Sequence, residues 1–227
     1  MQNDTTKCNR FEHPEFRLVF DSSVPSVDVD WLIRLLEEQV TTGAKFCDRE
    51  TIELGSMLFR VEFEDGILIL SEPDFKQFPI VWTQGVSNNL RNLRLQKDIY
   101  ESFDFDDEMA LPSILQSMIV GTDLSPLAKS FLLSRVQCSG ADSGWFVGRP
   151  DSKLDYNNPD NLRRTSVYQA MIDFPSIVAC LGLPSGLTVE ISQSQIAVSR
   201  EGVRSPVRPN SFLARVSATK RGRSVPG

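Results

Sequence analysis

Hydrophobic and polar residues alternate most regularly between Met57 and Phe63. Every second residue in this stretch is hydrophobic, and Leu58, Arg60 and Glu62 stand between them, which predicts a half-buried strand. Asp65-Gly66 follows, and an Asp-Gly pair favours a tight hairpin turn because glycine adopts positive φ without strain. Residues 67–70 are hydrophobic at every position, so we expect the returning strand to lie inside a sheet.

Two helices are predicted in the first half of the chain, after a short strand at residues 16–20. The first begins at Asp28, whose charge suits a helix N-terminus, and ends near Gly43. The second runs from about Ser87 to Phe103. The hydrophobic residues that recur at helical spacing in the first helix are Leu32, Leu35, Leu36 and Val40.

The second half mixes short strands, loops and helices. Pro112 suits the first turn of a helix that extends to Ile119, although the end of that run equally fits a strand. The further predicted elements, in order, are a hairpin (130–136 with 144–148), a loop (149–162), a short helix (166–174) and one or two edge strands (189–199).

Hairpins and helices without regular strand-helix alternation predict an α+β fold. A chain of 227 residues is long enough for two small cores, and the acidic run at 101–108 marks a boundary between them. The expected parts are a loose N-terminus (1–13), an α+β subdomain (14–105), a second α+β subdomain (108–199) and a basic, flexible tail (200–227).

Charge is distributed unevenly along the chain. The formal net charge is −6. Residues 200–227 contain seven basic residues and one acidic residue, so this tail carries +6 and the remaining body carries −12. Phosphates would repel such a body, which argues against direct binding of nucleic acid, whereas a basic protein would be attracted to it.

The sequence shows neither an export signal nor a membrane span. The first residues include no apolar signal-peptide core, and no run approaches the ~20 apolar residues that a spanning helix needs. The four cysteines form no C-x-x-C pair and indicate no disulfide framework, which fits a reducing compartment. We therefore expect a cytoplasmic protein that does not associate with membranes.

Patterns typical of enzymes are not found. The single histidine, His13, lies in a polar stretch and is expected at the surface, which disfavours Ser-His-Asp and Cys-His mechanisms. No nucleophile elbow, phosphate-binding glycine loop or zinc-ligand spacing occurs. We predict a non-enzyme with no catalytic residue, no metal and no cofactor.

Asp104, Asp106, Asp107 and Glu108 form the densest acidic cluster. Three interpretations are open: a solvated linker, a patch that pairs with Lys or Arg of a basic partner, or a divalent-cation site. The spacing lacks the glycine and the distal glutamate of an EF-hand. We name these four residues as candidate partner contacts, since an acidic patch would speed the encounter with a basic protein.

Two loops of the second half supply further candidates. Trp145 follows the turn formed by Asp142, Ser143 and Gly144, and Tyr156 follows Asp155. Tryptophan and tyrosine are frequent anchors of protein interfaces. The alternative for Trp145 is a core side chain behind a tight turn. We therefore name Asp142, Trp145, Asp155 and Tyr156 as candidate partner contacts.

Five stretches of the second half, in this order, resemble the immunity protein 33-like domain family. They are residues 131–135, 142–148, 158–162, 166–170 and 181–186. The resemblance covers about residues 128–190, and its most specific features are an Asp-Ser-Gly-Trp turn, an Asn-Pro-x-Asn-Leu loop and a tyrosine-containing helix. Tyr156 stands where the acidic loop of the family has histidine, so a role that needs that histidine does not carry over.

The resemblance implies an immunity protein of a bacterial polymorphic-toxin or type VI secretion system. Such proteins bind a cognate toxin and block its active site or its assembly. The expected location and the acidic body then favour a basic toxin that acts in the cytoplasm, with a nuclease as first choice. The alternatives are an effector chaperone or adaptor, and an enzyme that uses residues 104–108 with a metal.

Overall fold

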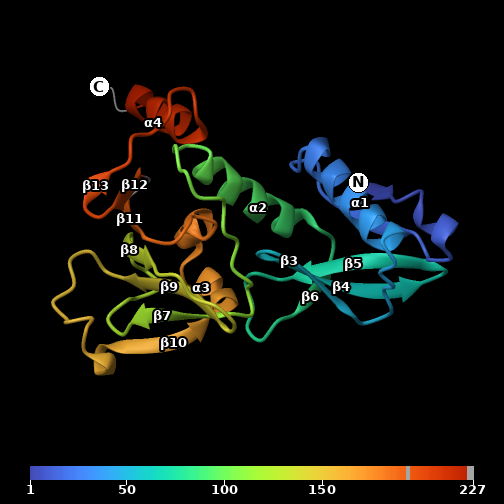
Figure 1. Ribbon diagram of the computed structural model, residues 1–227, viewed down its shortest axis with the longest axis horizontal. Coiled ribbons are helices and arrows are strands. Elements are labelled where there is room, and N and C mark those ends of the chain that lie inside the picture. The colour runs from blue at the N-terminus through green and yellow to red at the C-terminus, as the bar shows by residue number, and fades with distance from the viewer. Residues whose placement is uncertain (193–194, 224–227) are drawn as a thin grey trace. The chain divides into compact units, whose positions relative to one another are not determined.

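The computed structural model describes residues 1–192 and 195–223, with side chains described as far as residue 218. The chain forms two compact units, of which the first ends at Arg94 and the second begins at Leu95 (Figure 1). Each unit contains a β-sheet and helices, so the predicted α+β fold is confirmed. The boundary falls earlier than the acidic run at 101–108. That run belongs to the second unit, and two of its own residues, Ser102 and Phe103, are buried there.

The first unit combines one sheet with a long helix. Its elements are β1 (Gln2–Asp4), η1 (Cys8–Phe11), β2 (Phe16–Val19), α1 (Ser26–Thr41), β3 (Thr51–Leu54), β4 (Met57–Glu64), β5 (Ile67–Pro73), β6 (Trp82–Gln84) and the start of α2 (Ser87–Tyr100). The strand order is β1-β2-β5-β4-β3, with β6 also paired to β5. The predicted hairpin is present, because β4 and β5 pair antiparallel and Asp65 and Gly66 both have positive φ.

The core of the first unit lies between α1 and the sheet. Leu32, Leu36 and Val40 of α1 share one buried cluster with Phe59 and Val61 of β4. Helical spacing on one element and alternation on the other therefore meet in a single core. The alternation predicts that Phe63, the last residue of the pattern, is buried, but this residue is 50% exposed. Its backbone N–H donates to the Asp48 carboxylate.

The N-terminal stretch is ordered, which corrects the expectation of a loose segment. Two carboxylates hold it. Glu15 accepts hydrogen bonds from the Thr5 hydroxyl and from the backbone N–H groups of Cys8 and Asn9. Glu37 of α1 accepts from Thr6 N at 3.0 Å and from the Lys7 ammonium at 2.7 Å.

His13 is 3% exposed, so the expectation of a surface histidine is also wrong. Its Nδ1 lies 2.7 Å from the Pro14 carbonyl, and its Nε2 accepts the backbone N–H of Phe46 at 3.0 Å. The ring packs against Phe16 and Phe46. Both ring nitrogens are therefore used in holding the backbone, which is a structural role.

The N-terminus of α2 is capped by a buried carboxylate from β5. Glu72 accepts the backbone N–H of Asn88 at 2.9 Å and that of Asn89 at 2.8 Å. Burial raises the pKa of Glu72, against the effect of these two hydrogen bonds. An anion at this end of a helix satisfies donors that no preceding turn can reach.

The second unit contains a sheet in which seven strands of the described ranges pair. Its elements are the end of α2, β7 (Ser117–Gly121), β8 (Ser130–Arg135), β9 (Asp142–Gly148), η2 (Pro159–Asn161), β10 (Leu162–Ser166), α3 (Val167–Asp173), η3 (Pro175–Cys180), β11 (Leu187–Ser192), β12 (Gln195–Arg200), β13 (Val203–Arg204) and α4 (Phe212–Arg223). The strand order is β10-β7-β9-β8-β11-β12-β13.

The predicted hairpin and helix of this unit are present, whereas two other expectations are wrong. The helix expected from Pro112 is not formed, and residues 117–121 form β7, the strand that was the alternative for the end of that run, because they pair with β10 on one side and with β9 on the other. β11 lies between β8 and β12, so it is not an edge strand. Ser166 caps α3 by accepting the N–H of Gln169 at 3.0 Å.

The basic tail contains β13 and α4, and Leu213 of α4 is 6% exposed. This polar sequence, which lacks helical periodicity, nevertheless forms a helix, and the side chain of Leu213 is buried. The cationic side chains of Lys220, Arg221 and Arg223, on which part of the predicted tail charge depends, lie outside the described side chains. None of the helices in the described ranges combines the length and the hydrophobicity needed to cross a membrane.

Candidate functional site

The predicted partner contacts lie on three segments of the second unit. They are the segment 101–108 after α2, the turn 142–145 that opens β9, and the loop 149–161 between β9 and β10. The sheet positions the last two segments, since β9 lies inside the sheet between β7 and β8.

The turn at the start of β9 is shaped by Asp142 and Gly144. Asp142 Oδ1 accepts the Gly144 N–H at 2.9 Å, and its other oxygen lies 3.7 Å from the Arg164 guanidinium. Gly144 has φ of +74°, and a Cβ there would lie 2.1 Å from the Val136 carbonyl oxygen. Glycine is therefore required at this position. Asp142 is half-buried and mainly builds the turn.

Trp145 is a core residue, because it is 1% exposed and its Nε1 donates to the Leu181 carbonyl at 3.1 Å. The core interpretation of the turn is therefore correct, and Trp145 is not available as a binding anchor in this fold. A buried indole that also donates a hydrogen bond fixes the chain after η3 against the sheet.

Arg135 is a residue that sequence reasoning missed. It ends β8, pairs in register with Trp145, and places its guanidinium 5.3 Å from the centre of the Trp145 ring. Its Nη1 donates to the carbonyls of Ala110 at 2.5 Å and Leu183 at 2.6 Å. Burial lowers its pKa. Arg135 links β8 to the backbone at Ala110 and at Leu183. Because these three stretches are far apart in the sequence, local sequence patterns do not reveal the role of this side chain.

Tyr156 fastens the 149–161 loop to the sheet. Its ring lies over Gly121 of β7 and Gly148 of β9, where an added Cβ would come within 2.6 Å and 2.7 Å of ring atoms. The two glycines lie on neighbouring parallel strands and make room for the ring. Its hydroxyl donates to Asp123 Oδ1 at 2.7 Å and accepts the Arg149 N–H at 2.9 Å.

Asp123 stays ionised in this cluster. Burial acts to raise its pKa, but hydrogen bonds from the hydroxyls of Tyr156 and Ser152 outweigh burial, so the pKa is lowered. The loop is therefore held by a charged acceptor, and its outer residues are presented on a defined backbone. Among these outer residues, Asp155 is exposed and accepts the Asn157 N–H at 2.9 Å.

The acidic segment is exposed at Asp104, Asp106, Asp107 and Glu108. Asp107 forms an ion pair with Arg200, and its backbone carbonyl accepts the Tyr100 hydroxyl at 2.7 Å. Within the described residues no group of three or more His, Cys, Asp or Glu side chains is arranged to hold a metal ion. The side chains present therefore fit a charged surface better than a cation site.

The structure places the candidates on two separate surfaces. Figure 1 shows the segment 101–108 beside α4, and the loop after β9 at another end of the same unit. The acidic segment and the Asp155–Tyr156 loop therefore do not form one continuous patch in this view. A single partner that touches both must be large compared with either loop.

Comparison with known proteins gives one family for the second unit. Residues 95–201 match the model of the Imm33-like domain. The matched range begins where the second unit begins and ends before β13 and α4. No curated protein and no solved structure matches the chain.

Proposed function

Since the C-terminal half of this chain is an Imm33-like domain, which implies an immunity protein against a toxin, we propose that it neutralises a cognate toxin by binding it. The single observation that carries this proposal is the family match over residues 95–201. Family membership also suggests a protein without enzymatic activity, whose effect depends on the stability of the complex.

We further propose a basic toxin that acts in the cytoplasm, such as a nuclease effector of a type VI secretion system. Two features support this choice. The chain carries a net charge of −6, which attracts basic proteins over distance. Cys8, Cys47, Cys138 and Cys180 are all free thiols, which suits a reducing compartment.

The exposed residues of two surfaces are the proposed contacts. Asp104, Asp106 and Glu108 offer carboxylates to lysine and arginine side chains of the toxin, while Asp107 already pairs with Arg200. On the second surface, the exposed Asp155 and the half-buried Tyr156 lie on the loop that Tyr156 holds against the sheet. Asp142 shapes its turn, and Trp145 supports the fold from the core.

The experiment is co-expression with the toxin encoded beside this chain. We expect survival of cells that make both proteins, death of cells that make the toxin alone, and a one-to-one complex on purification. An unrelated toxin expressed in the same way is the control, and it should kill in the presence of the chain.

A second arm separates neutralisation from delivery. An effector chaperone would bind a targeting segment of the toxin, whereas an immunity protein binds the toxic domain. The purified toxic domain alone should therefore form the complex. Death despite good expression of the chain, with no complex, would contradict the proposal.

A further inference from the structure

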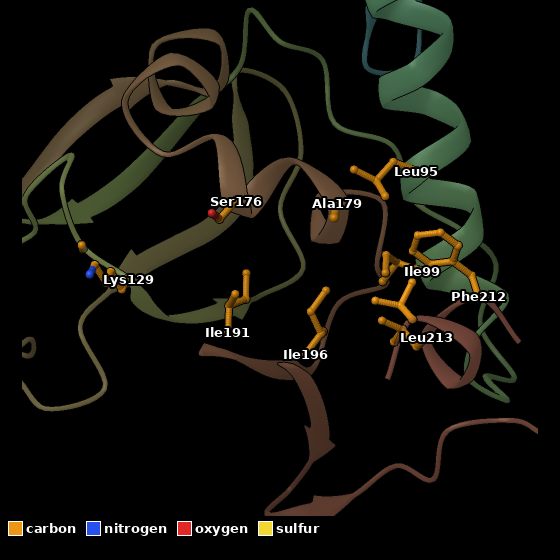
Figure 2. A pocket seen from close by; sticks show the side chains of 11 residues that line it. Leu95, Ile99, Lys129, Ser176, Ala179, Ile191, Ile196, Phe212 and Leu213 are labelled. Atoms are coloured by element: carbon orange, nitrogen blue, oxygen red, sulfur yellow. The ribbon is translucent and has the colours of Figure 1, made fainter. Parts of the chain in front are cut away.

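Two features of the second unit can receive a partner. One is an apolar groove of about 730 Å³ beside the end of α2, which Leu95 and Ile99 line together with Ile191 and Ile196 (Figure 2). Among the described residues of its lining there is one lysine and no carboxylate, so hydrophobicity alone selects an occupant. The other feature is the outer edge of β10, whose backbone groups specify an extended strand.

β10 is an edge strand of the second unit's sheet. It pairs with β7 on one side, and Figure 1 shows it at the outer side of the sheet. β13, at the opposite end of the strand order, has two residues, whereas β10 has five. β10 also lies inside the range that matches the Imm33-like domain. It is therefore the longer of the two terminal strands of this sheet, and an unpaired edge is a template for a further strand.

The register of the β10–β7 ladder shows which backbone groups of β10 are open. The Thr122 N–H donates to the Asn161 carbonyl just before the strand, and the Val167 N–H donates to the Gln116 carbonyl just after it. Backbone groups of an antiparallel strand point alternately to its two sides, so every second residue between these two bonds faces β7. The intervening residues, whose backbone groups point to the open edge, are Leu162, Arg164 and Ser166.

Two of the six backbone groups on this edge are already used. The Leu162 N–H donates to the Pro159 carbonyl, and the carbonyl of Ser166, the N-cap of α3, accepts the first hydrogen bond of that helix. The Leu162 carbonyl, the Arg164 N–H and carbonyl, and the Ser166 N–H remain. None of these four groups has a hydrogen-bond partner in the part of the chain that the structure describes. They are arranged as an added strand requires.

The two arginines of β10 indicate which side chains such a strand carries. The guanidinium groups of Arg163 and Arg164 each lie 3.7 Å from a carboxylate, of Asp173 and Asp142, and within the described residues neither makes a hydrogen bond. The side chains are 41% and 65% exposed. Consecutive residues of a strand point to opposite faces, so an added strand meets one arginine on each face. Carboxylates are the acceptors that bind guanidinium groups most strongly.

We propose that the open edge of β10 docks an extended strand of the toxin, with aspartate or glutamate side chains beside Arg163 and Arg164. Asp155 adjoins the start of β10, since its carbonyl accepts the side-chain amide of Asn161 at 2.9 Å, so the edge continues one of the proposed contact surfaces. The identity of the partner rests on the proposed function. Net charge acts on the approach of a basic toxin, whereas this local pairing acts within the complex.

The open edge is tested first in the free chain, by amide hydrogen exchange measured with NMR. The N–H groups of Arg163 and Thr165 face β7 and should exchange at least about 10-fold more slowly than that of Arg164. Equal exchange of the three would overturn the proposal. Analytical ultracentrifugation should find a monomer, and a dimer that Arg164→Pro dissociates would overturn it too, because a second copy would then occupy the edge.

The backbone contact is tested with the purified toxin and two variants at one position. Arg164→Pro removes an open N–H, and proline is tolerated on an edge strand where its nitrogen faces outward, so thermal unfolding should change little. Arg164→Ala is the matched control, since it removes the same charge and keeps the N–H. The dissociation constant should be at least about 10-fold higher for Arg164→Pro than for Arg164→Ala. Equal constants would overturn the proposal.

The charge preference is tested by Arg164→Glu, which makes the chain more acidic. Attraction of a basic toxin over distance would alone tighten binding, whereas we expect at least about 10-fold weaker binding because the new carboxylate faces those of the docked strand. Arg34→Glu, at an exposed position of α1, changes the net charge equally and should bind as the wild type or slightly tighter. Unchanged or tighter binding by Arg164→Glu would overturn the proposal.

Hydrogen exchange in the complex locates the docked strand directly. Exchange of the Arg164 and Ser166 amides should slow at least about 10-fold when the toxin binds, and unchanged exchange would overturn the proposal. If the toxin is neutralised but these amides and the Arg164 variants show no effect, the edge fails and the proposed function stands. If no complex forms although the free chain shows the alternating exchange, the proposed function fails and takes the docking of the toxin with it.

Discussion

The two units fasten their irregular segments by different means. The first unit uses carboxylates that accept backbone N–H groups: Glu15 and Glu37 hold the N-terminal stretch, and Glu72 caps α2. The second unit adds close packing to such carboxylate contacts: Gly144 lies against the Val136 carbonyl, and the Tyr156 ring lies over Gly121 and Gly148.

The difference shows which negative charges are available to a partner. In the first unit, several carboxylates are engaged by the backbone and cannot pair with a toxin without loosening the fold. In the second unit the carboxylates of 104–108 are exposed, and the irregular segments are fixed by steric fit together with hydrogen bonds to Asp123 and Asp142. We therefore expect pH to affect both units, and volume changes at these glycines to affect the second unit.

The largest effect is expected at Gly144. Gly144→Ala places a Cβ 2.1 Å from the Val136 carbonyl oxygen at a positive φ, and should lower the free energy of unfolding by about 3 kcal/mol. Gly140→Ala is the matched control, since its φ is also positive but nothing lies within 4 Å of the new Cβ. It should cost about 1 kcal/mol. Urea unfolding measures both, and equal costs would show that the close approach does not matter.

Glu72 tests the carboxylate cap of the first unit. Glu72→Ala leaves two N–H groups of α2, that of Asn88 part-buried and that of Asn89 buried, without their acceptor and should cost about 2 kcal/mol. Burial raises the pKa of Glu72 above its ordinary value of 4.5, so the folded state holds a proton more tightly than the unfolded state. The stability of the wild type should therefore fall as pH rises from 4.5 through the raised pKa.

Glu72→Gln removes that titration, so its stability relative to the wild type should increase over the same rise in pH. Urea unfolding of both proteins at a series of pH values measures the difference. A constant difference across the series would show that Glu72 titrates alike in the folded and unfolded chain.

A double-mutant cycle tests the contact between the Tyr156 ring and Gly121, which holds the 149–161 loop against the sheet. Gly121→Ala meets the Tyr156 ring at 2.6 Å and should cost about 2 kcal/mol, whereas the same change in a Tyr156→Ala background should cost little. The coupling, measured by urea unfolding, is the signature of direct steric contact. Additive costs would place the ring away from Gly121.

Glu37 gives the smallest effect and the opposite dependence on pH. Burial acts to raise its pKa, but hydrogen bonds from Lys7 and Thr6 outweigh burial and lower the pKa below 4.5. Its stabilising contribution is present above pH 4.5 and is lost as pH falls through the lowered pKa. Glu37→Gln should cost about 1 kcal/mol at pH 7, and the cost should shrink in acid. Thermal unfolding at pH 7 and at pH 3 checks this.

Regular periodicity predicted the fold wherever local signals and tertiary packing agree. The alternation from Met57 and the Asp65-Gly66 pair gave the β4–β5 hairpin, and helical spacing gave α1. The order of the N-terminal stretch could not be predicted, because Glu37 acts on Thr6 from 31 residues away. For the same reason the sequence left helix and strand open for β7, since its strand state depends on pairing with two distant strands.

The candidate site was predictable in part. The turn at Asp142 and the loop at Tyr156 are where the sequence indicated, because turn chemistry is local. The role of Trp145 was not predictable, since the same Asp-Ser-Gly-Trp turn serves a core indole or a surface anchor equally. Arg135 left no local trace, because its partners lie 25 and 48 residues away.

The central claim is that the exposed carboxylates of the second unit bind the toxin. The most direct test is the dissociation constant of the purified toxin for the chain with Asp104, Asp106 and Glu108 changed to lysine. The matched control changes Asp30, Glu38 and Glu53, which are exposed in the first unit, and so alters net charge equally. The account predicts about 100-fold weaker binding for the first variant and about 10-fold or less for the control. Equal weakening of the two would contradict it, because only the overall charge would then matter.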